Sequence, residues 1–330
     1  MLLDYCPTAM MTVRLGTRGS KLALARSAGV AALLEGSQPG LKVDLVVIDT
    51  TGDREQGSAL PGRGGKGALI KEIEEALLGG RIDLAVHSLR DVATFLPEGL
   101  VLAGFPERED PHDLLVTRDG GGLDSLRAGA RVATGSPHRR AQLLARRPDL
   151  RFIPPGGSLE ARLRRLEEGL ADALVLAAAR IARLGLRQAV RAQVLPEDIC
   201  LSSPGQGIVA MEAREEDEEM REQVAAIGDP TATVEACAER GFLAGLGGDC
   251  LLPVAALARF DGRRVRIKAR ILSPDGVRCA SGEAEGRPTD AYRVGADSAR
   301  LCLDRGGREM LAGMESATEP SKQTGEAEGD

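Results

Sequence analysis

Residues 80–94 read Gly80-Arg81-Ile82-Asp83-Leu84-Ala85-Val86-His87-Ser88-Leu89-Arg90-Asp91-Val92-Ala93-Thr94. The apolar run from Ile82 to Val86 predicts a buried strand, and a polar cluster of His, Ser, Arg and Asp follows it directly. Open α/β sheets bind ligands at the carboxyl ends of their strands, so we expect this cluster to line a binding site. The carboxyl group of Asp91, beside a cation and a hydroxyl, suits a general acid, although an isolated Asp in this pattern also caps turns.

The chain on both sides of this segment alternates strand and helix patterns. Strands alternating with helices predict largely parallel sheets that are covered by helices. The predicted strands are residues 13–16, 43–48, 82–86, 113–116, 131–134, 173–177 and 208–211. The predicted helices are residues 20–34 and 68–78, with two more near 139–146 and 159–169. The acidic run 214–222 predicts the solvated face of a further helix.

Two Pro-rich and Gly-rich segments, 105–111 and 203–207, predict crossings between domains. The region 230–312 predicts a smaller α+β unit, with alternating apolar residues in 265–271 and a turn at 274–276. The resulting domains are 12–105 plus 206–224, then 106–205, then 225–312. Residues 1–11 and 313–330 predict a disordered extension and a disordered polar tail.

The composition excludes several classes of protein. A net charge of −6, no Trp, two Tyr and five Phe argue against a nucleic-acid binder. No stretch reaches the roughly 20 apolar residues of a membrane helix, and the first residues lack a secretory pattern. The six cysteines show no metal-binding spacing, so we expect no metal site and reduced thiols in the cytoplasm.

One cysteine has an unusual setting. Cys250 lies in Leu246-Gly247-Gly248-Asp249-Cys250-Leu251-Leu252-Pro253, where the glycines leave little side-chain cover. A cysteine on a Gly-rich loop is better placed for covalent chemistry than one on a core face. Most isolated cysteines are small buried hydrophobes, and that interpretation suits Cys237 and Cys302.

These segments resemble the porphobilinogen deaminase family over roughly residues 12–312, with six or seven motifs in the family's order. The further motifs that carry the resemblance are Leu15 to Ala25, Thr50 to Asp53, Gly65-Lys66-Gly67, Ala133 to Leu143, Gly156 to Arg162, and Glu239 to Leu243. The first of these is a strand-to-helix turn whose backbone amides suit a carboxylate, although Ser20 alone would be an ordinary helix N-cap.

The resemblance implies two α/β domains like those of solute-binding proteins, facing a cleft, plus a small α+β C-terminal domain that presents Cys250. It implies a monomeric hydroxymethylbilane synthase of tetrapyrrole biosynthesis. Four porphobilinogen molecules would be added one at a time, with loss of ammonia, to a dipyrromethane cofactor linked to Cys250, and water would then release the linear tetrapyrrole. Asp91 would be the catalytic acid. The implied cofactor-binding residues are Cys250, Ser88, Arg90, Ser136, Arg139, Arg162 and Lys66, and the implied substrate-binding residues are Arg18, Ser20 and Arg183.

The chain departs from the family's pattern at four of these positions. Arg90 stands where Lys is usual, and Asp249 stands where Gly is common. His138 replaces the first of two paired arginines, with Arg140 as a candidate to compensate, and Gly156 stands where a motif begins with Arg. A lost charge-assisted contact typically costs about 1.5–3 kcal/mol. We therefore expect Gly156→Arg to tighten binding.

Two other functions remain open at this point. The lost arginines favour a non-catalytic, carboxylate-binding paralogue of the same fold. A phosphate-dependent transferase would use the Gly-rich stretch 57–67, but that stretch lacks a GxxxxGK[ST] pattern.

Overall fold

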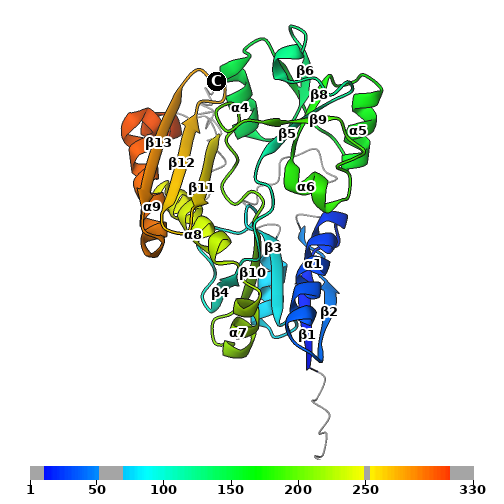
Figure 1. The fold of residues 1–330 in the computed structure, drawn as a ribbon, viewed down its shortest axis with the longest axis vertical. Helices are drawn as coiled ribbons and strands as arrows, with labels where there is room; N and C mark the ends of the chain where they lie inside the picture. Colours follow the sequence, from blue (N-terminus) through cyan, green and yellow to red (C-terminus); the bar gives the residue numbers. More distant parts are fainter. Residues whose placement is uncertain (1–10, 52–69, 249–252, 313–330) are drawn as a thin grey trace, which may run out of the picture.

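The computed structural model describes residues 11–51, 70–248 and 253–312. Lys66, Asp249 and Cys250 lie outside the described residues, so the predictions made for them are not addressed by the structure. Figure 1 shows two mixed sheets, one above the other, and a third, smaller sheet beside them. The predicted α/β fold class, with a small α+β unit at the C-terminal end, is confirmed.

The first sheet has the strand order β2-β1-β3-β10-β4. Its first three members, β2, β1 and β3, are parallel, and β10 lies antiparallel between β3 and β4. The strands are β1 (Met11–Thr17), β2 (Leu41–Val47), β3 (Leu84–Ser88), β4 (Leu100–Gly104) and β10 (Val209–Arg214). The helices of this unit are α1 (Lys21–Ser37), α3 (Lys71–Leu78) and α7 (Glu218–Ala226). Buried aliphatic side chains of α1, the central strands and α7 form one core.

The prediction for the third strand is wrong by two residues at each end. The strand begins at Leu84, after Ile82 and Asp83, and it runs on to Ser88. The Asp83 carboxylate instead accepts a hydrogen bond from the backbone N–H of Arg14 on β1 (2.9 Å). The strand extends beyond Val86 at its C-terminal end because β10 pairs with it up to Ser88, which lies opposite Val209.

The second sheet has the order β7-β6-β8-β5-β9, with β5 antiparallel to both of its neighbours. The strands are β5 (Asp113–Thr117), β6 (Arg131–Ala133), β7 (Arg151–Ile153), β8 (Ala173–Ala177) and β9 (Ala192–Leu195). The helices are η2 (Leu123–Ser125), α4 (Pro137–Arg146), α5 (Leu159–Glu167) and α6 (Ala178–Arg183). Pro137 suits the first turn of α4, where its missing N–H is no loss.

The third sheet is the antiparallel meander β11 (Val254–Phe260), β12 (Val265–Leu272) and β13 (Cys279–Gly286). Alternate residues of β12 are buried, as its sequence pattern predicts. They pack on α8 (Pro230–Gly245) and α9 (Ala291–Cys302) around the fully buried Phe242. The short turns η3 (Pro288–Asp290) and η4 (Leu303–Gly307) flank α9.

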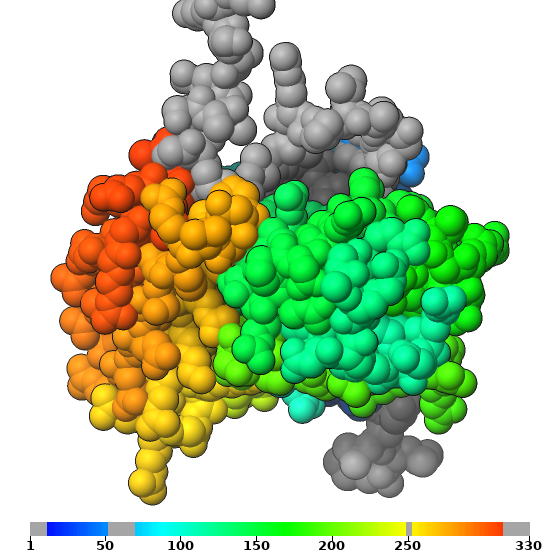
Figure 2. All heavy atoms as spheres, turned by 90° about the horizontal axis from the view of Figure 1, so that it is seen from above, coloured from blue at the N-terminus to red at the C-terminus, as the bar shows by residue number. Residues whose placement is uncertain are grey.

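The third unit lies directly against the second. Figure 2 shows the yellow-to-red C-terminal unit side by side with the green second unit. The contact includes a hydrogen bond from Arg270 on β12 to the Gln142 side chain on α4 (3.0 Å).

The predicted helix in 214–222 is partly wrong, because Arg214 still belongs to β10 and the side chain of Asp217 caps a helix that begins at Glu218. The domain boundary drawn after residue 224 falls inside this helix, α7.

Candidate active site

Two connected hollows lie between the first and second sheets. The larger has a volume of ≈ 1150 Å³, and the smaller, of ≈ 400 Å³, extends toward Leu243 and Val254 of the third unit. Four arginines line both: Arg90, Arg139, Arg162 and Arg180. The larger hollow also brings together Arg18, Ser20, Ser88, Asp91 and Arg183, and Ser136 lines the smaller one. Each predicted site residue that the structure describes therefore lies at one of these hollows.

The start of α1 supplies one wall of the larger hollow. The Ser20 hydroxyl accepts a hydrogen bond from the Ala23 N–H (3.3 Å), so the N-cap interpretation of this residue is confirmed. Because Arg18 and Ser20 both line the hollow, the cap and the binding wall are the same turn.

The end of β3 supplies Asp91. The turn is closed by the Asp91 backbone N–H, which donates to the Ser88 carbonyl (2.9 Å). Among the described residues the Asp91 carboxylate makes no hydrogen bond or ion pair, so it is not used there as a turn cap. His87 faces the other side of the sheet, where its Nε2 lies 3.0 Å from the buried Glu212 carboxylate. Side chains alternate along a strand, which explains why only part of the polar cluster reaches the hollow.

Gln206 ties the two sheets together below the arginines. Its side-chain oxygen accepts hydrogen bonds from Arg90 (3.1 Å) and Arg139 (3.3 Å). Its amide nitrogen donates to the carboxylate of Asp113 (2.7 Å), which also accepts a hydrogen bond from Arg139 (2.7 Å). The neighbouring Gly207 has φ +81°, and a Cβ there would lie 2.4 Å from the Glu109 carbonyl oxygen. Only glycine lets the crossing segment 203–207 pass so close to the crossing segment 105–111.

Positive charge dominates the site. Burial lowers the pKa values of Arg90, Arg162 and Arg180, and repulsion among the arginines adds to the effect. Burial likewise lowers the pKa of Arg26, which lines the larger hollow, to about 10. All remain cationic near neutral pH, and unpaired buried cations are costly. The site is therefore suited to an anion with several negative groups.

His138 adds no charge to this cluster. Burial and the neighbouring Arg139 lower its pKa to about 3, so the imidazole is neutral near pH 7. Its Nδ1 lies 2.7 Å from the Ser136 Oγ. Arg140, the candidate to compensate for it, is exposed and lines neither hollow. That compensation is contradicted by the structure.

Gly156 lies in a left-handed conformation, with φ +58°. A Cβ at this position would come within 2.6 Å of an Arg165 terminal nitrogen. Non-glycine residues pay about 1–2 kcal/mol for this backbone region. An arginine at this position would therefore strain the loop, and the prediction that Gly156→Arg tightens binding stays a prediction.

Sequence reasoning missed four residues of the site. Arg26 and Arg180 stand within Ala-rich and Leu-rich helical segments, where a single Arg looks like an ordinary solvated position. Asp113 is the first residue of a strand, and Gln206 stands between two glycines. The signal available for both was a polar residue at a position that the structure buries. Gln206 is identified by its hydrogen bonds to Arg90 and Arg139, which lie 116 and 67 positions away. Arg26 and Arg180 are identified by their place in the lining of the hollows.

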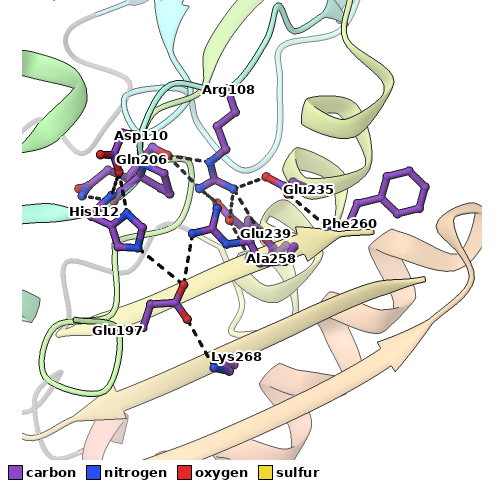
Figure 3. Close-up of polar contacts among 12 residues, drawn as sticks. Arg108, Asp110, His112, Glu197, Gln206, Glu235, Glu239, Ala258, Phe260 and Lys268 are labelled. Atoms are coloured by element: carbon purple, nitrogen blue, oxygen red, sulfur yellow. Dashed lines mark hydrogen bonds and ion pairs between the residues drawn. The ribbon is translucent and has the colours of Figure 1, made fainter. Parts of the chain in front are cut away.

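Arg108 joins the third unit to this arrangement (Figure 3). It lies on the crossing segment 105–111. Its Nε and one terminal nitrogen donate to the Gln206 backbone carbonyl (3.1 and 2.8 Å). It also pairs with Glu235 (2.9 Å) and Glu239 (2.8 Å) of α8. Glu239 accepts further hydrogen bonds from the N–H groups of Gly205 (2.6 Å) and Ala258 (2.9 Å). The helix that precedes Cys250 in the sequence is thus anchored to the base of the site.

The described residues fit a bound group that carries several carboxylates. The buried Nε atoms of Arg26, Arg139 and Arg180 have no hydrogen-bond partner among the described residues, although each is a donor inside or beside the hollows. No cluster of three or more potential metal ligands occurs in the part of the chain that the structure describes. None of its described helices is long and apolar enough to cross a membrane. The fold and the site together are those of a protein suited to holding a polycarboxylate between two α/β units.

Comparison with known proteins names the family. The family described as "Porphobilinogen deaminase, dipyromethane cofactor binding domain" matches residues 13–222, and "Porphobilinogen deaminase, C-terminal domain" matches residues 233–304. The porphobilinogen deaminase of Syntrophus aciditrophicus is 43% identical over 303 residues, which cover 92% of this chain and 99% of the relative. That of Rubrobacter xylanophilus is 44% identical over 297 residues, covering 90% and 95%. The chain belongs to the porphobilinogen deaminase family.

The predicted hydroxymethylbilane synthase activity, that of a transferase in porphyrin biosynthesis, is confirmed by this membership. Residues 13–222 form the domain to which the family description assigns dipyrromethane binding.

Among solved structures, the probable amino-acid ABC transporter extracellular-binding protein ytmK of Bacillus subtilis is 12% identical to this chain. Its TM-score is 0.41, over 66% of this chain and 89% of its own.

Proposed function

We propose that this chain joins four porphobilinogen molecules one at a time, with loss of ammonia, and then releases the linear tetrapyrrole by hydrolysis. The primer is a dipyrromethane cofactor held by a thioether to Cys250. When bound, this cofactor supplies a nucleophilic pyrrole carbon to which the first unit is joined. The observation that carries the proposal is one cleft that gathers the five predicted arginines and Asp91.

Asp91 is the proposed catalytic acid. Its carboxyl group lines the cleft and makes no bond with the described residues, so it is available to the substrate. It would give a proton to the leaving amine of porphobilinogen, and the resulting carboxylate would stabilise the cation that remains. Arg26 and Arg90 lie close enough for Asp91 to raise their pKa values by charge attraction.

The arginines are the proposed carboxylate-binding residues. Arg18 and Arg183, with Ser20, would hold acetate and propionate groups of the incoming substrate in the larger hollow. Arg90, Arg139 and Arg162, with Ser88 and Ser136, would hold those of the cofactor, and Lys66 is proposed as a further cofactor-binding residue. Guanidinium groups bind carboxylates in a bidentate manner, which fixes each pyrrole ring in register as well as in place.

Arg139 is already oriented for this role. Asp113 and Gln206 hold one terminal nitrogen, and its Nε is left without a partner among the described residues. Arg183 is also partly committed, because its Nε donates to the Glu109 carboxylate (3.0 Å). Substrate carboxylates must therefore share Arg183 with Glu109. We also propose that the protein works as a monomer in the cytoplasm. Its domains are divided as the sequence predicts, except that the first extends to the end of α7 at Ala226.

The experiment is the intact mass of the purified protein, measured beside its Cys250→Ser variant. We expect the wild type alone to carry the added mass of two linked pyrrole units. If neither protein carries this mass after incubation with porphobilinogen, the covalent cofactor is refuted. A non-catalytic, carboxylate-binding paralogue would then be the better description.

A further inference from the structure

Arg180 on α6 lines both hollows, and it differs from the other three arginines that do so. Arg139 pairs with Asp113, Arg90 donates to Gln206, and Arg162 donates to the Gly157 carbonyl. Within residues 11–51, 70–248 and 253–312, the Arg180 side chain makes no hydrogen bond or ion pair, and its Nε is buried without a partner. The protein therefore holds a guanidinium at this junction without satisfying it.

The electrostatic surroundings make this arrangement unfavourable in the absence of a ligand. Burial and the charge of Arg139 both lower the pKa of Arg180, and only Glu160 acts in the opposite direction. Glu160 is itself bound to Lys21 across the cleft (3.0 Å). A desolvated cation that lacks its own counterion costs free energy that an anionic ligand can recover.

Arg180 lines the same hollows as a loop that offers them no charge. Pro155 lines the smaller hollow and Gly157 lines the larger one, whereas Gly156 between them offers no side chain. The neutral His138 on the same wall supplies no charge either. Arg180 lines both hollows from a different element, α6, so it supplies a cation to the hollows that these two residues leave without a charge.

We propose that Arg180 is a binding residue, which pairs with a pyrrole carboxylate at the junction of the two hollows in place of a side chain at Gly156. This inference rests on the proposed function and assigns a further residue to the same site. It implies that Arg180 opposes the stability of the empty protein and contributes to affinity once the site is filled. A residue with a purely structural role would act in the opposite way in the empty protein.

The test uses Arg180→Met, which keeps an unbranched stem and removes the charge, in the full-length Cys250→Ser background. The matched control is Arg164→Met, because Arg164 is exposed on α5 and lines neither hollow. Thermal unfolding is measured without ligand, and porphobilinogen is titrated by calorimetry. We expect Arg180→Met to leave Tm unchanged or raised and to weaken binding about 10- to 100-fold, as for one charge-assisted contact. The affinity of Arg180→Lys should fall between those of the parent protein and Arg180→Met, because lysine keeps the charge without the planar fork.

Affinity equal to that of the Arg164→Met control, or a lowered Tm with unchanged affinity, overturns the inference. The same substitution in the wild-type background gives a second reading, in which cofactor retention by mass and the KM for porphobilinogen should change. A wild type with neither added mass nor turnover refutes the proposed function instead. The titration into the Cys250→Ser protein still decides the role of Arg180 in that case.

Discussion

Arg108→Met is the substitution whose effect the structure predicts most directly. The side chain pairs with two carboxylates, Glu235 and Glu239, whose side chains are 6% and 0% exposed. Without Arg108, Glu239 keeps the backbone donors of Gly205 and Ala258, and Glu235 keeps that of Phe260. Breaking a buried pair by removing one partner typically costs about 3–5 kcal/mol, because a charge is left uncompensated.

This cost can be measured by urea denaturation followed by far-UV circular dichroism. With an m value of about 3 kcal/mol/M, the midpoint should fall by roughly 1–2 M. The control is Arg259→Met, which removes an exposed ion pair to Glu197 (3.2 Å) and should cost about 0–1 kcal/mol. Adding Glu239→Gln to Arg108→Met should recover part of the loss, because the uncompensated charge is removed as well. If Arg108→Met unfolds at the same urea concentration as the Arg259 control, the reasoning is refuted.

Three further predictions concern the site itself. Asp91→Asn should lower kcat by at least about 100-fold while the cofactor mass stays attached, and unchanged turnover would rule out the general-acid role. The pKa of His138 is about 3 in the folded protein and 6.5 ordinarily, so the unfolded chain binds its proton first as the pH falls. This contribution to stability is complete above pH 6.5 and is lost as the pH falls toward 3, by roughly 2 kcal/mol at pH 5. His138→Gln should therefore reduce the fall in the urea midpoint between pH 7 and pH 5. If the midpoint of the variant falls as much as that of the wild type, the low pKa of His138 is contradicted. Gly156→Arg should lower the free energy of unfolding by about 1–2 kcal/mol, and an unchanged or raised urea midpoint would show that the loop relaxes.

The sequence predicted those parts of the site that local pattern controls. The apolar run before Ser88 marks a strand end, and the turn at Ser20 marks a helix start, so both walls of the larger hollow were predictable. The contributions of Gln206 and Arg180 were not, because their roles come from partners and neighbours far away in the sequence. The antiparallel insertion of β10 was also beyond local pattern, since its apolar residues suit any buried strand.

The position of β10 has a consequence for the order in which the protein folds during synthesis. The second sheet uses only residues 113–195, so it can be completed while the chain is still being made. The first sheet has a vacant central position between β3 and β4 until residues 209–214 emerge. Its early strands must wait for about a hundred residues, during which β3 and β4 each expose an unpaired edge. The wall that carries Asp91 therefore assembles after the second unit, and a nascent chain truncated before residue 209 should hold a folded second unit beside an unfinished first one.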